Sequence, residues 1–143
     1  MNLIVAGGRD FKDFELGFKL IDRVTANTPK EDITIVCGKA KGADTCGEEW
    51  YELHKHEGVQ ISYHIPDWDN IEVEGAVVKK NRFGKPYNAV AGHWRNSDME
   101  SEATHLIAFW NEISKGTRDM IRKIKSSGKP HRVFDYEGNL LGV

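Results

Sequence analysis

Hydrophobic and polar positions follow two different rhythms along this chain. Five short, mostly apolar runs have the length of buried strands and are bounded by glycine, proline or polar residues. Between them, apolar residues recur every three or four positions, as they do on the inner face of a helix. We therefore predict strands at Asn2–Ala6, Ile33–Cys37, Val59–Ile65, Thr104–Trp110 and Arg132–Phe134, and helices at about Asp13–Ala26, Ala43–Glu57, Ala89–Glu102 and Thr117–Ser126.

The alternation of strands and helices predicts the fold class. Such an order implies right-handed crossovers and a parallel sheet. We expect one domain over residues 1–143: an α/β, Rossmann-like, doubly wound and mostly parallel sheet, strand order 3-2-1-4-5, with helices on both faces. Residues 69–88 break the rhythm and predict a hairpin that turns near Glu74-Gly75, followed by a basic, flexible stretch at Lys79–Pro86. This excursion would form a lid or a contact surface, and Asp135–Val143 a turn with a terminal strand or tail.

Three glycine-bearing loops follow apolar runs and are the main functional signal. They are Gly7-Gly8-Arg9-Asp10, the segment Gly38 to Asp44 that contains Gly42 and Ala43, and Ser114-Lys115-Gly116-Thr117. Loops at the carboxyl ends of parallel strands gather at one edge of the sheet, where such folds bind ligands. Glycine permits close approach to the backbone, and a helix that starts there offers free N–H groups to an anion. The sequence therefore predicts a phosphate or nucleotide crevice.

Each of these residues also has a purely structural interpretation. The glycines of the first loop suit a tight turn, whereas the planar fork of Arg9 suits phosphate or carboxylate. Gly42 and Ala43 suit a helix that starts close to the sheet or to a ligand. Asp44 would contact a ribose hydroxyl or interact with the helix dipole.

The third loop and the aromatic residues leave alternatives open too. Ser114 or Thr117 caps the helix and Gly116 lets phosphate reach it, but the loop is not a GxxxxGK[ST] motif, so an ATPase or kinase has no support. Arg95-Asn96 would ordinarily be solvent-exposed residues on the surface of a helix, with no role in a site. Among the tryptophans that could stack on a base, Trp110 is favoured by its place at the end of a strand.

Composition excludes several classes of function. A net charge of −2 argues against nucleic-acid binding through bulk charge, although Lys79, Lys80, Arg82 and Lys85 form a local basic cluster. We expect no metal site, because the histidines are scattered, and no disulfide framework, because Cys37 and Cys46 are the only cysteines. No apolar run is long enough for a membrane span, and the chain enters a strand at once, so we expect no signal peptide, no membrane contact and a cytoplasmic protein.

Several motifs, in this order, resemble the SLOG superfamily, named for the DNA-processing protein Smf/DprA and the Lonely Guy enzymes, and in particular its DUF2493 (YspA-like) branch. The motifs are Gly7-Gly8-Arg9-Asp10-Phe11, Gly38 with Ala40 and Gly42-Ala43-Asp44, Pro66-Asp67-Trp68, Ala91 to Met99, His105 to Trp110, and Ser114-Lys115-Gly116-Thr117 with Met120-Ile121. The resemblance implies a domain that binds nucleotides or nucleotide-derived ligands, and it makes Arg95 and Asn96 site residues. It also implies a homodimer or larger homo-oligomer, and a phage or mobile-element origin with a role in phage–host conflict.

Two departures from the family pattern matter. Met120 stands where the Lonely Guy motif has its catalytic Glu, which speaks against that hydrolase activity. Lys39 stands where the branch usually has a second glycine.

Three hypotheses follow from the sequence. The first is binding or sensing of a nucleotide-derived small molecule, with no other cofactor assigned. The second is a hydrolase that cleaves an N-glycosidic or phosphate bond, with Asp44 and Asp98, or else Asp10 and Asp67, as candidate acids. The third is a protein-interaction module that docks through residues 69–88.

Overall fold

The computed structural model describes residues 1–143 and has a five-stranded sheet in the order β3-β2-β1-β6-β7. Every neighbouring pair is parallel, and Val5 lies opposite Ile107 where the two central strands pair. Because β6 and β7 are the fourth and fifth strands of this sheet, the predicted order 3-2-1-4-5 is confirmed. The strands are β1 Asn2–Gly7, β2 Thr34–Cys37, β3 Gln60–Tyr63, β6 His105–Phe109 and β7 His131–Phe134.

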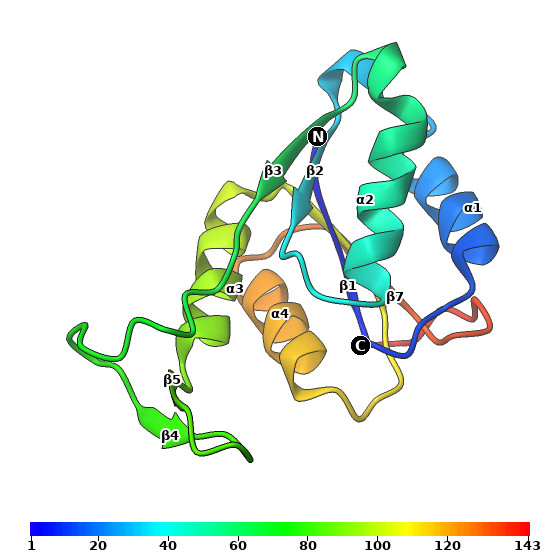
Figure 1. The fold of residues 1–143 in the computed structure, drawn as a ribbon. Coiled ribbons are helices and arrows are strands. Elements are labelled where there is room, and N and C mark those ends of the chain that lie inside the picture. The colour runs from blue at the N-terminus through cyan, green and yellow to red at the C-terminus, as the bar shows by residue number, and fades with distance from the viewer.

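Two helices cover each face of the sheet (Figure 1). On one face lie α1 (Phe14–Val24) and α2 (Ala43–His54), and on the other α3 (Ala91–Glu102) and α4 (Lys115–Ser126), with short 3-10 turns at Lys30–Asp32 and Lys55–Glu57. The side chains of β1 alternate between the two layers. Leu3 and Val5 belong to a cluster of 15 buried residues on the α1–α2 side. Ile4 and Ala6 belong to a cluster of 12 on the α3–α4 side, so the strand is apolar throughout.

The two cysteines lie inside the first of these clusters. Cys37 is 1% exposed and Cys46 is fully buried, and both are free thiols. Burial raises the pKa of Cys37 to about 11 and that of Cys46 to about 12. Both thiols therefore belong to the apolar core.

The excursion contains a hairpin, but its turn is not where the sequence suggested. Strands β4 (Val78–Lys80) and β5 (Pro86–Asn88) pair antiparallel around a turn at residues 81–85. Asn81 fixes this turn, because its side-chain oxygen accepts from the backbone N–H of Phe83 at 2.9 Å and of Lys85 at 3.0 Å. The segment expected to be flexible is therefore the hairpin itself. Glu74-Gly75 forms only a local turn, closed by the Ala76 N–H on Val73.

The chain ends as predicted, in a turn and a short tail. The Asp135 carboxylate accepts from the backbone N–H groups of Glu137 and Asn139, and Leu140 bridges back to Phe134 in antiparallel sense. No helix in the structure combines the length and the apolar character needed to cross a membrane.

Candidate functional site

The three loops meet at the edge formed by the carboxyl ends of the strands, the lower edge in Figure 1. A cavity of about 280 Å³ opens there between β1, the β2–α2 loop, α3 and the start of α4. A second hollow of about 320 Å³ shares Arg9, Ala40, Trp68 and Arg95 with it, so the two adjoin. Eight of the predicted site residues line the cavity: Gly7, Arg9, Asp44, Arg95, Asn96, Ser114, Gly116 and Thr117.

The first turn of α4 presents unpaired backbone donors to this cavity. Ser114 caps the helix, because its hydroxyl accepts from the Thr117 N–H at 3.4 Å and from the Thr117 hydroxyl at 3.0 Å. The N–H groups of Lys115 and Gly116 have no acceptor within the chain. A Cβ atom at Gly116 would meet nothing within 4 Å, so this position is open. Such a helix start is suited to bind an anion.

The glycines of the first loop serve the packing of the chain. A Cβ atom on Gly7 would lie 2.3 Å from the carbonyl oxygen of Phe109, and one on Gly8 would lie 1.9 Å from the hydroxyl of Tyr136. The Gly8 N–H also donates to the Phe109 carbonyl at 3.1 Å, and Gly8 does not line the cavity. Arg9 is exposed and lies on the rim of the cavity.

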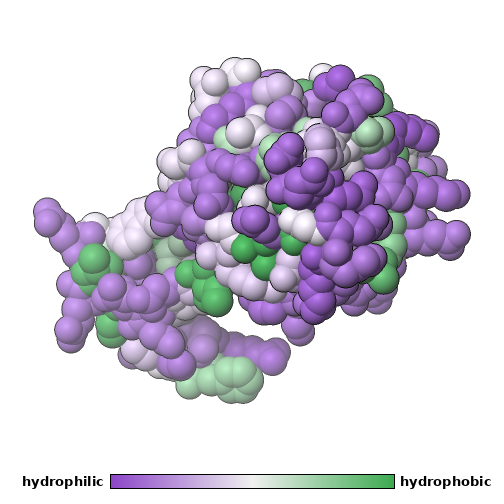
Figure 2. Space-filling view, turned by 90° about the horizontal axis from the view of Figure 1, so that it is seen from above, coloured by the Kyte–Doolittle hydropathy of each residue, from purple (hydrophilic) through white to green (hydrophobic).

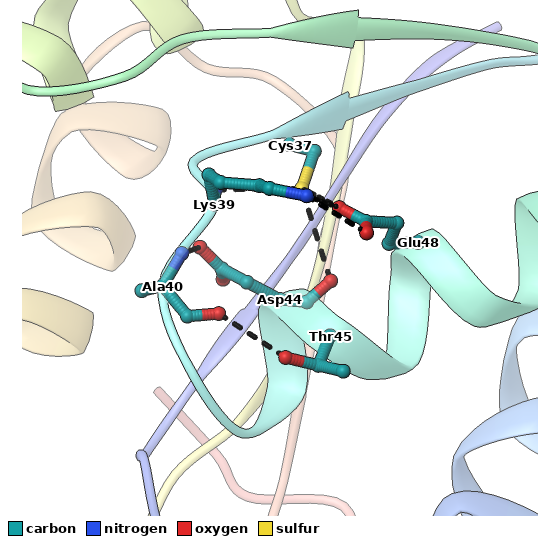
Figure 3. A network of polar contacts seen from close by, with 6 residues as sticks. All are labelled: Cys37, Lys39, Ala40, Asp44, Thr45 and Glu48. Atoms are coloured by element: carbon teal, nitrogen blue, oxygen red, sulfur yellow. Dashed lines mark hydrogen bonds and ion pairs between the residues drawn. The ribbon is translucent and has the colours of Figure 1, made fainter.

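The second loop is closed by its own hydrogen bonds (Figure 3). The Asp44 carboxylate accepts from the Ala40 N–H at 3.1 Å, and the Lys39 ammonium pairs with Glu48 at 2.9 Å. Lys39 has a φ of 60°, the left-handed conformation that glycine adopts more readily. Gly42 has a φ of 80°, and a Cβ atom there would lie 2.1 Å from the Gly8 carbonyl oxygen. The loop is thus a support for the start of α2.

Asp44 and Arg95 form the polar floor of the cavity. Asp44 is only 7% exposed, and its burial raises its pKa to about 6, although the Ala40 N–H and the charge of Arg95 act in the opposite direction. Burial also lowers the pKa of Arg95. The Arg95 guanidinium donates to the Gly38 carbonyl and, from Nε, to Asn96 at 2.9 Å, whereas its Nη2 has no partner in the chain. Nη2 therefore remains available to a ligand.

A second buried carboxylate, Asp119, joins α3 to α4. Its oxygens accept from Asn96 Nδ2 at 3.0 Å and from the Lys123 ammonium at 2.5 Å, and His93 Nδ1 lies at 3.3 Å. Burial raises the pKa of Asp119, but the hydrogen bonds from Lys123 and Asn96 outweigh it and leave the pKa below its ordinary value. Sequence reasoning missed this residue, since an acid between Arg118 and Lys123 looks like part of a solvated helix face.

Other predicted residues lie outside the cavity. Trp110 is 9% exposed, packs in the core and donates from its indole N–H to the Ser114 carbonyl at 3.1 Å. Gly38 lines the adjoining hollow, and Asp98, together with Asp67, lines another hollow of about 220 Å³ that shares only Arg95 with the cavity. Gly42 is partly exposed and Ala43 is fully buried, and neither lines the cavity.

Trp68 is the aromatic residue at the cavity, where it is 40% exposed. No group of three or more His, Cys, Asp or Glu side chains is placed to hold a metal ion. A larger hollow, about 490 Å³, lies at the opposite edge around Met1, His105 and Leu140.

The fold and the cavity together define a Rossmann-like α/β domain with a ligand-sized crevice at the strand exits. Residues 1–70 match the model of the YspA, cpYpsA-related SLOG family. The predicted resemblance to the SLOG superfamily and its YspA-like branch is confirmed by this match.

Among solved structures, the chain is similar to the DNA processing protein A (DprA) of Streptococcus pneumoniae, with 17% identity and a TM-score of 0.59. The similarity covers 94% of this chain and 49% of that chain, so this chain spans about half the length of that protein. At this identity the likeness shows the fold alone. No curated protein gives a significant match.

Proposed function

We propose that this protein binds a phosphorylated, nucleotide-derived small molecule in the cavity at the start of α4. One observation carries the proposal: the free N–H groups of Lys115 and Gly116 adjoin an open position in a cavity that Arg9 and Arg95 also line. A phosphate on these donors would gain charge-assisted hydrogen bonds. The exposed face of Trp68 would take a base or another flat group. We place this function in the cytoplasm.

Isothermal titration calorimetry tests the proposal with nucleoside mono- and diphosphates, ADP-ribose and cyclic nucleotides. We expect one member of the panel to bind. The Arg9→Gln variant should bind this ligand with lower affinity, because a guanidinium can form two hydrogen bonds to a phosphate. Arg122→Gln is the matched control, since Arg122 is an exposed arginine on α4 outside the cavity. Absence of binding at millimolar ligand, or equal losses in both variants, would refute the proposed site.

A second candidate function rests on the two buried carboxylates. Asp44 holds a proton more readily than an ordinary Asp, whereas Asp119 is held ionised, and carboxylates with pKa values pushed apart suit a general acid and a general base. In hydrolysis of an N-glycosidic bond, the oxygen of a water molecule would attack C1′ while Asp119 accepts a proton from that water. The C1′–N bond would break with its electron pair going to the base nitrogen, which would receive the proton of Asp44.

Chromatographic assay for released base tests this second function. Turnover should be lost in Asp44→Asn and Asp119→Asn and kept in Asp98→Asn, because Asp98 lines a different hollow. Ligand binding without turnover in the unaltered protein would leave the first proposal standing and reject the second.

A further inference from the structure

The β4–β5 hairpin has a net positive charge, whereas the rest of the chain has more acidic than basic residues. We call residues 77–88 the basic arm. They include Lys79, Lys80, Arg82 and Lys85 and no acidic residue, although the whole chain has a net charge of −2. Only Lys85 has an ion pair, with Asp69 at 3.2 Å. The other three cations are exposed and have no acidic partner.

An aromatic ring stands at the tip of this arm. Phe83 is 80% exposed, the most exposed large hydrophobic side chain in the protein. The Arg82 guanidinium lies 4.8 Å from the centre of its ring, so a cation and a flat apolar surface are presented together. Burying such a ring inside the domain would be the usual outcome, and nothing in the chain covers it.

The arm holds a defined shape. Its turn is closed by Asn81, and its base is fixed by the Asn88 N–H on the Trp68 carbonyl at 2.7 Å and the Ala89 N–H on Val77 at 2.7 Å. Tyr87 packs edge to face on Trp68, with ring centres 6.3 Å apart. Figure 1 shows the hairpin standing away from the sheet and helices, and Figure 2 shows hydrophilic and hydrophobic side chains mixed over the projecting part.

We infer that the basic arm binds single-stranded nucleic acid. Its cations fit a run of phosphates, and the free face of Phe83 fits an unpaired base, which is the combination that binds single strands without sequence preference. An acidic protein surface could pair with the cations of the arm, but such pairing would not account for the exposed ring of Phe83. A membrane surface would require a continuous apolar face, whereas Phe83 is separated from the adjacent Val77 and Val78 by the charged and polar residues 79–82.

This inference does not depend on the ligand of the cavity, but the two sites are neighbours. Trp68 and Ala89, which fix the base of the arm, both line the cavity. A single-stranded nucleic acid that extends to the base of the arm would therefore lie beside the cavity.

Fluorescence anisotropy with a labelled oligo-dT of about 12 nucleotides tests the charge component across a salt series. We expect binding whose logarithm falls linearly with the logarithm of salt concentration. The double variant Lys79→Gln/Arg82→Gln should flatten this slope by about 0.7 for each phosphate contact that is lost. The control Lys19→Gln/Arg23→Gln removes the same charge from exposed positions on α1 and should keep the slope.

The stacking component is tested separately. Phe83→Ala should weaken binding about 5- to 150-fold, in keeping with the loss of one base–aromatic contact, whereas Phe83→Trp should keep it. Leu53→Ala, at another exposed apolar position, is the control and should change nothing. An oligo-rU should bind as oligo-dT does, because both offer phosphates and base faces.

Three outcomes would overturn the inference. The first is absence of oligonucleotide binding at low salt. The second is equal binding of poly-glutamate with no effect of Phe83→Ala, which would assign the arm to acidic proteins. The third is binding of anionic lipid vesicles in place of oligonucleotide. Because all the altered side chains are exposed, unchanged thermal melting of each variant shows that its fold is intact.

Discussion

Glycine occurs in all three loops at the strand exits, and it has two different tasks there. Gly7, Gly8 and Gly42 leave room for other parts of the chain, since an added Cβ atom would collide with Phe109, Tyr136 or Gly8. Gly116 lines the cavity and is open, because no atom of the chain lies within 4 Å of the same point. At the scale of single residues, only Gly116 has the surroundings expected of a ligand-contacting glycine.

Gly116→Ala separates stability from binding. The change should leave stability unchanged or raise it by up to about 1 kcal/mol, because alanine is the better helix former. It should weaken phosphate-ligand binding, because the new methyl group stands where the ligand approaches the N–H groups. Urea denaturation and calorimetry give the two readouts. Gly142→Ala, a second open glycine, should leave affinity unchanged, and a Gly116→Ala protein with full affinity would contradict the prediction.

Asp44 should make stability depend on pH in a particular direction. Burial raises its pKa from 3.8 to about 6, so the folded protein holds this proton more tightly than the unfolded chain. Stability due to this group is therefore full below 3.8 and is lost as the pH rises through about 6. The loss should be about 3 kcal/mol.

Asp44→Asn removes this titration and is the direct test. The variant should gain stability relative to the unaltered protein as the pH rises from 4 to 7, measured by urea denaturation at each pH. A difference for Asp44→Asn that does not vary with pH would show that the carboxyl group is not desolvated.

At the scale of the elements, helices α3 and α4 are joined by a buried polar contact as well as by apolar packing. Asn96, only 7% exposed, donates to Asp119 at 3.0 Å and to the Gly116 carbonyl at 3.3 Å. The start of α4, where the anion is proposed to bind, is thus positioned from α3. Asn96 therefore helps to position the proposed anion site even if it does not contact the ligand.

Asn96→Ala should destabilise the protein by about 1–3 kcal/mol, because it leaves buried hydrogen-bonding groups without partners. It should also weaken ligand binding through the misplaced start of α4. Ser97→Ala, on the exposed side of the same helix, should change stability by less than about 0.5 kcal/mol. Thermal melting and calorimetry measure the two effects, and equal melting temperatures for both variants would argue against the contact.

The elements of the sheet could be predicted because the signals were local. Fully apolar runs such as that of β1 report strands buried on both faces, and helical spacing of apolar residues located α1. The turn of the hairpin was missed because it depends on the side chain of Asn81, which competed with a plausible Glu-Gly turn. The spacing of residues on α4 also could not reveal that Asp119 is buried. Its burial results from the packing of α4 against α3, where its partner Asn96 lies 23 residues earlier in the chain.

The predicted site residues show the same division. Their gathering at one edge followed from the parallel order of the strands, but their individual roles did not. Trp110 lies at the end of a strand as predicted, but its side chain is buried and donates a hydrogen bond to the Ser114 carbonyl. Trp68, which lies outside the predicted loops, lines the cavity instead.

At the scale of the whole molecule, the charge is divided unevenly. The whole chain has a net charge of −2, whereas the charged side chains of the basic arm are all positive, and the base of this arm is anchored at the cavity. The chain also spans 49% of the length of the DprA protein that shares its fold. The cavity and the basic arm are thus two adjacent surfaces of different chemistry.

The buried cysteines provide a built-in reporter of opening of the core. A thiol reacts as its thiolate, and Cys37 and Cys46 are both enclosed and carry pKa values of about 11 and about 12. We expect a disulfide reagent such as dithionitrobenzoate to modify the folded protein at neutral pH only as fast as the core opens. The labelling rate should therefore rise with urea in step with the unfolding equilibrium, and a ligand that binds the folded state should slow it. Immediate labelling of both thiols would mean that the α1–α2 face exchanges with an open form, and the same measurement can be used to screen ligands without a dye or an introduced label.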